Sequence, residues 1–500
     1  MSTLKSRITN AVVSLTGDSK RLPHRLHTIA HLGKHLAPTA GHRRLLTLLE
    51  RAIEENHPSI QLIARIMDQT SRPYHAALAR LFVEHAWEGY RQRDQFRKEH
   101  GLFPPSFIVL SPLAACNLGC QGCYAGAYGH QEPMLSYADI ERIIREAKGW
   151  GSRFITISGG EPTLLWRRVP GEQRGLRDLA REHQDMGFLV YTNGTLISDD
   201  MAAEMAELGN VSPALSIEGY REHTDGRRGD GVFDRLLHAM EILRRHKVLF
   251  GASVTYTQRN LETVASDEFI EFLIAQGCFY AWYFMYIPVG RAPDLSLMVT
   301  PEQRRQMARK TYEWLTRRPI FVADFWNSGP LVGGCIAAGR PNGYLHVNHR
   351  GDITPCVFMM YSTHNIHDSQ SETPLLDALR SDFFQHLRAG QQEVEHNPLS
   401  PCLIVDHPEV LREAVEATGA RSTQEGQTVL TELQPELAER AAQWQAIADE
   451  MWHGGEVYPG VAETYNENNW QWPEAAMVSP AGMVGRRRPR EVHRLWRSAS

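Results

Sequence analysis

Apolar residues recur along the 500-residue chain with two different periods, and the change of period divides the sequence into regions. Up to residue 104 they repeat every three or four positions, as in Leu45–Leu49 and Ile60–Met67, which predicts amphipathic helices. The Pro104–Pro105 pair ends this pattern. Residues 1–104 are therefore predicted to form an N-terminal helical domain.

Between residues 105 and 298, short apolar runs alternate with helical patterns, as expected of βα units. The predicted strands are Phe107–Leu110, Phe154–Ser158, Phe188–Thr192, Ala214–Ile217, Phe250–Tyr256 and Tyr280–Tyr286. Six units in succession predict an α/β fold with a parallel sheet, either a (β/α)6 partial barrel or a doubly wound sheet. In both architectures the chemistry lies at the carboxyl ends of the strands.

The last two hundred residues follow a different pattern. Residues 299–430 contain short predicted strands at Tyr344–Val347 and Ile353–Thr354 together with three further cysteines, which predicts a separate C-terminal domain. Residues 431–500 are rich in Trp and Pro and form a predicted extension that ends in the basic run Arg486–Arg490.

Composition narrows the class of protein. A hydrophobic share of 42% and a charged share of 22% are ordinary for a globular protein, and a net charge of −5 argues against a nucleic-acid binder. Seven cysteines are too few for a disulfide scaffold and fit a reducing compartment with metal-bound thiols. No signal peptide and no run of eighteen apolar residues is found, so we expect a cytoplasmic protein without a membrane span.

Three cysteines, Cys116, Cys120 and Cys123, lie within eight residues, shortly after the first predicted strand. Thiolates are the usual ligands of iron–sulfur clusters, and a [4Fe–4S] cluster takes four. Three ligands leave one iron free for a substrate or cofactor, so the spacing indicates a reactive cluster. A structural zinc site is the alternative, but it needs a fourth ligand close by, and only His130 is near.

Three later strands also end in glycine and polar residues. The second strand ends in Ser158–Pro162, the third in Tyr191–Thr195 and the fourth in Ser216–Gly219. Each alone is ordinary turn chemistry, but three at one edge of a sheet indicate a ligand site. Arg228 follows the fourth strand closely enough to hold a carboxylate through two hydrogen bonds.

This order of motifs, over about residues 105–290, resembles the radical S-adenosylmethionine (SAM) superfamily. The resemblance implies a (β/α)6 partial barrel in which Cys116, Cys120 and Cys123 hold a [4Fe–4S] cluster whose open iron binds SAM. It also implies an enzyme in which one electron cleaves SAM to a 5′-deoxyadenosyl radical that abstracts hydrogen from the substrate. A flavodoxin- or ferredoxin-type protein is the expected electron donor.

The same resemblance assigns residues to SAM. They are Tyr124, Gly159, Gly160, Glu161, Asn193, Ser216 and Arg228. It implies that Tyr124 packs near the adenine, that the two glycines and Glu161 contact the amine, and that Ser216 and Arg228 also bind SAM. Asn193 is a looser match to the family.

Three cysteines further along the chain are similar to the auxiliary-cluster extensions, called SPASM or twitch, that follow many radical SAM barrels. They are Cys335, Cys356 and Cys402. The closing C-x2-C pair of that pattern is absent, so an auxiliary [4Fe–4S] cluster would have an open iron or take a fourth ligand from elsewhere. The candidates for that ligand are Asp406, His407 and Cys278, the last of which is more typical of a core residue. Buried thiols without metal are the alternative.

The substrate is the least constrained part of the prediction. The sixth strand and its exit, Phe279–Gly290, are unusually aromatic, which suits either core packing or an apolar wall for a substrate. Sequence segments such as Ser111–Tyr128 and Pro401–Pro408 are similar to those of the subgroup that includes the tetraether-lipid synthases. We therefore expect hydrogen abstraction from an unactivated carbon of a small-molecule or lipid substrate, with carbon–carbon bond formation as one outcome. The N-terminal helices are candidates for peripheral membrane contact.

Two other functions remain open at this point. The first is a radical SAM enzyme that matures a ribosomal peptide, although such enzymes usually carry a winged-helix recognition domain and residues 1–104 are predicted to be all helical. The second is a non-catalytic iron–sulfur or zinc protein that binds a partner.

Overall fold

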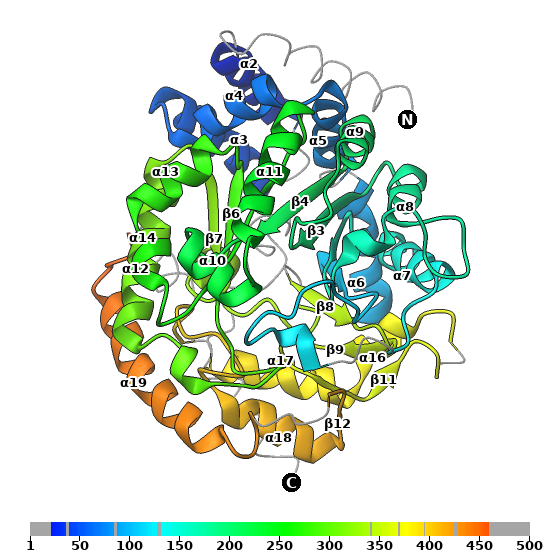
Figure 1. Ribbon diagram of the computed structural model, residues 1–500, viewed down its shortest axis with the longest axis vertical. Helices are drawn as coiled ribbons and strands as arrows, with labels where there is room; N and C mark the ends of the chain where they lie inside the picture. The colour runs from blue at the N-terminus through cyan, green and yellow to red at the C-terminus, as the bar shows by residue number, and fades with distance from the viewer. Residues whose placement is uncertain are drawn as a thin grey trace.

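The computed structural model describes residues 22–459, apart from residues 37–39, 85–87, 128–131, 341–342, 369–370, 395 and 425–428. The predictions made for His130, for Arg486–Arg490 and for the first 21 residues lie outside this part of the chain. At its centre is a ten-stranded sheet in the order β11-β9-β8-β1-β2-β3-β4-β5-β6-β7 (Figure 1). The sheet is open, with β11 and β7 as its two edges.

Strands β1 to β8 run in one direction and pair with one another in parallel, whereas β9 pairs antiparallel with both β8 and β11. Their bounds are β1 Phe107–Leu110, β2 Phe154–Ile157, β3 Gly187–Thr192, β4 Val211–Ser216, β5 Gly251–Tyr256, β6 Tyr280–Met285, β7 Phe321–Asp324, β8 Tyr344–Val347, β9 Asp352–Thr354 and β11 His364–Asn365. A separate two-stranded sheet pairs β10 Tyr361–Ser362 with β12 Arg421–Ser422. The predicted α/β fold with a parallel partial barrel is confirmed.

Helices surround the sheet. Those before and between the first seven strands are α2 Leu22–Leu36, α3 Ala40–Glu54, α4 Pro58–Gln69, α5 Arg72–Glu84, α6 Tyr90–His100, α7 Tyr137–Gly149, α8 Leu176–Glu182, α9 Asp199–Leu208, α10 Arg221–Arg228, α11 Val232–Arg245, α12 Leu261–Val264, α13 Asp267–Ala275 and α14 Pro301–Arg317. The later ones are α15 Gly329–Val332, α16 Pro374–Arg380, α17 Asp382–Val394, α18 Pro408–Thr418 and α19 Gln434–His453. Short 3-10 turns are η3 Tyr124–Ala127, η4 Pro162–Leu165 and η5 Leu295–Leu297.

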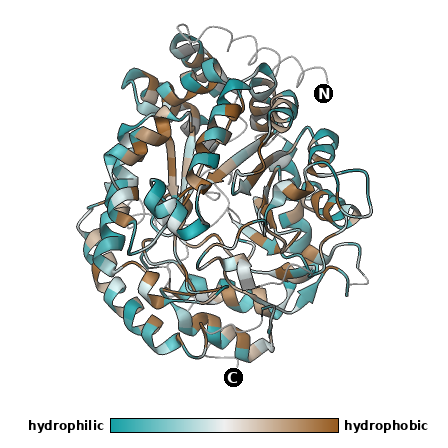
Figure 2. Ribbon diagram, in the orientation of Figure 1, coloured by the Kyte–Doolittle hydropathy of each residue, from teal (hydrophilic) through white to brown (hydrophobic). Residues whose placement is uncertain are grey.

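Helix α7 shows how the sequence sets these elements. Ser136 accepts a hydrogen bond from the Asp139 N–H and donates its own N–H to the Asp139 carboxylate, a capping box that fixes where the helix begins. Ile140, Ile143 and Ile144 then fall on one face and are buried against the sheet. Figure 2 shows the same division over the molecule, with hydrophobic strands inside and hydrophilic outer faces on the helices. None of the helices in the described residues is both long enough and apolar enough to cross a membrane.

The N-terminal helices pack at the amino ends of the strands. The Arg65 guanidinium of α4 donates to the carbonyls of Pro319 and Cys278, each of which lies two residues before a strand, β7 and β6 respectively. The Tyr74 hydroxyl of α5 donates 2.5 Å to the carbonyl of Val211, the first residue of β4. In Figure 1 these helices (blue) lie at the end of the molecule opposite α17 and α18. The helices therefore close the end of the barrel that is remote from the carboxyl ends of the strands.

The segment that follows β6 is continuous with the barrel. Helix α14 and β7 add a seventh parallel strand beside β6, and β8 returns to pair with β1 in register from Phe107–Tyr344 to Leu110–Val347. The rings of Phe107 and Tyr344 stack at 5.2 Å across this pair. The sequence boundary at residue 298 therefore marks a change of pattern along the chain, while the sheet continues across it.

Candidate active site

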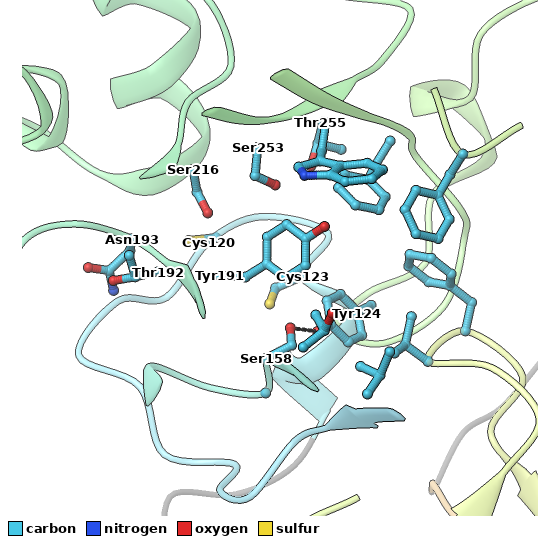
Figure 3. A pocket seen from close by; sticks show the side chains of 18 of the residues that line it. Cys120, Cys123, Tyr124, Ser158, Tyr191, Thr192, Asn193, Ser216, Ser253 and Thr255 are labelled. Carbon is cyan, nitrogen blue, oxygen red and sulfur yellow. Dashed lines mark hydrogen bonds between the residues drawn. The ribbon is translucent and has the colours of Figure 1, made fainter. Parts of the chain in front are cut away.

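The three N-proximal cysteines lie on the loop between β1 and η3, at the carboxyl ends of the strands. All three line one cavity of about 250 Å³ that extends from the carboxyl ends of β1 to β6 down to Phe107 and Phe154, at the amino ends of β1 and β2. Figure 3 shows Cys120 and Cys123 near Tyr191, with Ser216, Ser253 and Thr255 along one side. Since parallel strands expose their carboxyl-terminal residues at one edge, motifs far apart in the sequence meet here.

Backbone hydrogen bonds join the cysteine loop to the end of β2. The N–H of Gly160 donates to the Leu113 carbonyl and the N–H of Glu161 to the Ala115 carbonyl, each at 2.9 Å. A Cβ on Gly160 would lie 2.0 Å from the Ala115 oxygen, so no larger residue fits without moving the loop. Gly160 therefore sets the distance between the loop and the strand end.

Glu161 does not face the cavity, in contrast to the SAM contact predicted for it. Its side chain is buried, with 1% exposure of the residue. One carboxylate oxygen accepts from the Thr163 N–H, the Thr163 hydroxyl and the Thr192 hydroxyl, and the other accepts from the Asn193 N–H at 2.7 Å. Glu161 thus ties the end of β2 to the end of β3, and within the Gly-Gly-Glu motif Gly159 and Gly160 are the residues that line the cavity.

Arg228 also has a partner that the sequence analysis did not assign. It lines the cavity, but its guanidinium forms a buried ion pair with both carboxylate oxygens of Glu218, which Arg227 contacts at 2.6 Å. Burial acts to raise the pKa of Glu218, but the charges of Arg228 and Arg227 outweigh it and lower the pKa. The sequence alone did not pair these residues because ten positions and a helix separate them.

Arg228 and Asn193 both reach the cysteine sulfurs. Arg228 Nη1 donates to Cys120 Sγ and Asn193 Nδ2 to Cys116 Sγ, each at 3.8 Å, and the Leu118 N–H donates to Cys116 Sγ at 3.4 Å. Burial raises the pKa of Cys120, whereas Arg228 lowers it. N–H donors and a cation next to sulfur favour the thiolate form that binds iron.

Tyr124 and Ser216 line the cavity as the sequence analysis expects of residues near a ligand. The Tyr124 hydroxyl bonds to the Ser158 hydroxyl at 2.5 Å (Figure 3), which ties the residue after Cys123 to the end of β2. Ser253 and Thr255 of β5 also line the cavity and were missed. The sequence does indicate this position, because Ser253 and Thr255 alternate along β5 with the apolar Ala252 and Val254. Successive side chains of a strand point to opposite faces, so the two polar residues face away from the apolar core that Ala252 and Val254 join.

The opposite wall of the cavity is aromatic. Trp282 and Phe284 of β6 line it together with Phe325 and Phe358. The rings of Phe284 and Phe325 lie 4.6 Å apart, and the ring of Phe358 meets Tyr124 edge-on at 5.3 Å. The cavity therefore has a polar side over the strand ends and an apolar side formed by β6 and the segments after β7 and β9.

The later cysteines converge at a second place. Cys335 follows α15, Cys356 follows β9 and Cys402 precedes α18, and each thiol is close enough for its charge to affect another of the three. Burial raises the pKa of Cys335 and Cys356 to about 11 and that of Cys402 to about 12. The N–H groups of Phe358 and Ile404, two residues after their cysteines, donate to Cys356 Sγ at 3.5 Å and Cys402 Sγ at 3.4 Å.

The candidate fourth ligands are engaged elsewhere. Asp406 accepts two hydrogen bonds from Arg304, at 2.5 and 3.1 Å, and a third from the Cys402 N–H. His407 Nε2 bonds to the Ser400 carbonyl at 3.0 Å. Cys278 is fully buried two residues before the amino end of β6, whereas Cys116, Cys120 and Cys123 follow the carboxyl end of β1. Its position fits the core role that the sequence favoured.

Both cysteine groups fit an iron–sulfur cluster. Within the described residues no three His, Cys, Asp or Glu side chains converge closely enough to hold a single metal ion. A [4Fe–4S] cluster does not need such convergence, because each thiolate binds a different iron. The donors to Cys116, Cys120, Cys356 and Cys402 supply the hydrogen bonds to sulfur that such clusters use.

Comparison with known proteins gives this arrangement a family. Residues 110–270 match the family model described as the radical SAM superfamily. This segment is a radical SAM domain. The match agrees with the radical SAM domain predicted from the cysteine spacing and the strand-end motifs.

Curated relatives match the radical SAM domain and part of the chain around it. The Fe-coproporphyrin III synthase of Methanosarcina barkeri is 31% identical over 45% of this chain and 57% of its own length. The mycofactocin maturase MftC of Mycolicibacterium smegmatis is 29% identical over 54% of this chain and 68% of its own length. Among solved structures, Streptococcus suis SuiB bound to precursor peptide SuiA aligns with 20% identity and a TM-score of 0.47, over 58% of this chain and 68% of that chain.

Proposed function

We propose that this radical SAM enzyme matures a peptide by abstracting hydrogen from an apolar side chain that enters the strand-end cavity. The observation that carries the proposal is the aromatic wall of Trp282, Phe284, Phe325 and Phe358, which lies in the same cavity as the three cysteines. A wall of this kind holds an apolar group by burial and leaves few polar atoms to compete for the radical.

In this proposal Cys116, Cys120 and Cys123 hold the SAM-binding cluster, and Cys335, Cys356 and Cys402 hold an auxiliary one. When bound, the first cluster would supply one-electron reduction of SAM, and with it the radical chemistry that removes hydrogen from the substrate. The chain positions SAM through the Gly159–Gly160 backbone, Ser216 and Asn193, while Glu161 and Glu218 hold those segments in place. A flavodoxin- or ferredoxin-type protein is the proposed electron donor.

The names of the relatives support a peptide more than a lipid. MftC of Mycolicibacterium smegmatis and the sporulation killing factor maturation protein SkfB of Bacillus subtilis are both named as maturation proteins. A lipid tail is the second candidate, favoured only by the apolar wall. Delivery of a lipid by membrane-docked N-terminal helices is not supported, because α4 and α5 pack at the other end of the strands.

The first test is anaerobic reconstitution followed by measurement of 5′-deoxyadenosine. We expect cleavage of SAM under reductant by the wild-type chain, and none by a variant in which Cys116, Cys120 and Cys123 are changed to Ala. That variant should keep the iron of the auxiliary cluster. Intact clusters without SAM cleavage would contradict the assignment of this cavity.

The second test concerns the substrate. The chain is co-expressed with short peptides encoded beside its gene, and the peptides are analysed by mass spectrometry for a change in mass. Trp282→Ala should reduce modification of the peptide while SAM cleavage without peptide continues, and Tyr220→Ala, an exposed aromatic outside the cavity, should change neither. Modification of phospholipid acyl chains in the same cells, with unmodified peptides, would favour the lipid candidate.

A further inference from the structure

The hydroxyl of one buried tyrosine meets the sulfur of a cysteine in the second group. Tyr344 is the first residue of β8 and is 2% exposed. Its hydroxyl bonds to Cys356 Sγ at 3.0 Å. A buried hydroxyl without a partner costs free energy, and a phenylalanine would fill the same space without that cost. The hydrogen bond to sulfur is therefore what a tyrosine adds at this position.

The surroundings of Cys356 suit a sulfur that accepts hydrogen bonds. The Phe358 N–H donates to the same sulfur at 3.5 Å, so the Tyr344 hydroxyl from β8 and an N–H from the cysteine's own loop both reach it. A neutral thiol is a weak acceptor, whereas hydrogen bonds to an ionised acceptor are strong. Two donor groups at one sulfur therefore fit an iron-bound thiolate, which is the state proposed for Cys356.

The ring of Tyr344 also forms part of the wall of the strand-end cavity. Phe107, whose ring stacks on Tyr344 at 5.2 Å, lines the same cavity. Val357 and Phe358, which directly follow Cys356, line it as well. The side chain of Tyr344 thus extends from the cavity that the first three cysteines line to the sulfur of Cys356.

We propose that Tyr344 is a positioning residue of the auxiliary cluster, whose hydroxyl donates a hydrogen bond to the sulfur of Cys356 when the cluster is bound. The inference rests on the auxiliary cluster of the proposed function and is independent of the peptide substrate. Donors to cluster sulfur stabilise the more negative, reduced state, so they raise the reduction potential. Loss of the Tyr344 hydroxyl must therefore lower the potential while the three cysteine ligands stay in place.

The experiment uses the full chain with Cys116, Cys120 and Cys123 changed to Ala, so that only the auxiliary cluster forms. Potentiometric titration followed by electron paramagnetic resonance gives its midpoint potential, and iron and sulfide analysis gives its occupancy. Tyr344→Phe should lower the potential at unchanged iron content, because it removes the hydroxyl and keeps the ring. A ring-fluorinated tyrosine in place of Tyr344 should raise the potential, because fluorine makes the hydroxyl a stronger donor.

Tyr283→Phe is the matched control. Tyr283 is a fully buried tyrosine of β6 whose hydroxyl donates to the Val264 carbonyl at 3.0 Å, and it does not line the cavity. Each of the two phenylalanine variants loses one buried hydrogen bond, so both should unfold at a lower temperature than the parent in the metal-free state. Only Tyr344→Phe should shift the potential.

Four results would overturn the proposal. The first is an unchanged potential in Tyr344→Phe at full iron content, and the second is an equal shift in Tyr283→Phe, which indicates general loosening of the sheet. The third is loss of iron from a folded Tyr344→Phe protein, since that result indicates a ligand rather than a hydrogen-bond donor. The fourth is a parent that binds no cluster, and this result counts whether or not the wild-type chain cleaves SAM or modifies a peptide.

Discussion

Two buried glutamates, Glu161 and Glu218, organise the cavity without lining it. Each residue is 1% exposed, and each carboxylate is fully used within the protein. Glu161 joins the ends of β2 and β3 through four hydrogen bonds, whereas Glu218 forms ion pairs with both Arg227 and Arg228 beside the cysteine loop. Positions that line the cavity are therefore held in place by carboxylates that lie behind them.

We expect Glu161→Gln to lower the stability of the folded protein by about 1–3 kcal/mol, because one carboxylate oxygen becomes an NH2 group that cannot accept hydrogen bonds. SAM binding should weaken as well, since Gly160 is adjacent. Urea unfolding and equilibrium binding of SAM to the reconstituted protein measure the two effects. Glu207→Gln, on the exposed side of α9, serves as the control, and equal stability of the two variants would contradict the role given to Glu161.

Arg228→Lys tests the buried ion pair. A lysine cannot bond both oxygens of Glu218 and also reach Cys120, so we expect a loss of about 1–3 kcal/mol and lower iron content after reconstitution. Arg221→Lys provides a matched comparison, because Arg221 forms a two-bond pair with Asp234 on the surface and should cost less than 1 kcal/mol. Full iron loading of Arg228→Lys would show that the guanidinium does not support Cys120.

Part of this residue chemistry could be predicted from the sequence. The spacing of Cys116, Cys120 and Cys123 and the glycines at 159 and 160 placed the cavity correctly, because strand ends meet at one edge of a parallel sheet. The internal partners of Glu161 and Arg228 could not be foreseen. They depend on which side chains the turns after β3 and β4 bring together, and a strand-end motif does not specify that.

At the scale of elements, α7 and α16 are joined by a carboxyl group with an unusual pKa. Glu146 of α7 accepts hydrogen bonds from the N–H groups of Leu375 and Leu376, at 3.3 and 2.9 Å, at the start of α16. Burial raises the pKa of Glu146 to about 7, against these N–H groups, which lower it. The Glu146 carboxyl group at this contact therefore keeps its proton up to about pH 7.

This pKa predicts the direction of a pH effect. The folded value lies above the unfolded value of 4.5, so the folded state binds the proton more tightly. The stability that Glu146 contributes is thus present below about pH 4.5 and is lost as the pH rises through 7. We expect the unfolding temperature of Glu146→Gln to fall less between pH 5.5 and 8 than that of wild type, measured by calorimetry on the metal-free protein. Glu393→Gln, an exposed residue of α17, should follow wild type.

The pattern of apolar residues identified the first six strands. It did not show that β7 and β8 are also parallel strands of the same sheet. Phe321–Asp324 is only four residues long, and nothing in its pattern distinguishes it from a loop that joins two domains. Tyr344–Val347 was recognised as a strand, yet its neighbour β1 lies more than two hundred residues earlier. The alternation of hydrophobic residues indicates that a strand exists, whereas the strand it pairs with is determined by the fold of the whole chain.

At the scale of the molecule, the continuous sheet makes the two cysteine regions one structural unit. His346 of β8 bonds to the Ser111 hydroxyl at 2.8 Å on one ring nitrogen and to the Thr354 hydroxyl at 2.8 Å on the other. Ser111 begins the cysteine loop, and Thr354 lies two residues before Cys356. One side chain thus connects the two cysteine groups through hydrogen bonds.

We therefore expect a fragment that ends at Met298 to fail to fold. It lacks β7 and β8, so β6 and β1 both become unpaired hydrophobic edges, which favours aggregation. Gel filtration and circular dichroism of the fragment and the full chain make the comparison. A monomeric fragment with a cooperative unfolding transition would show that the barrel is independent of the later segment.

The pairing of β1 with β8 also has a consequence for how the enzyme is made. The ribosome releases the cysteine loop long before it synthesises residues 344–347, and at about 5–20 residues per second the interval is on the order of tens of seconds. During that time the loop has no strand on one side and no contact with His346. Iron delivered early would meet mobile thiols that other metals can also bind. We therefore expect the cluster to be inserted after the sheet is complete. This order of events would keep other metals from occupying the three thiols.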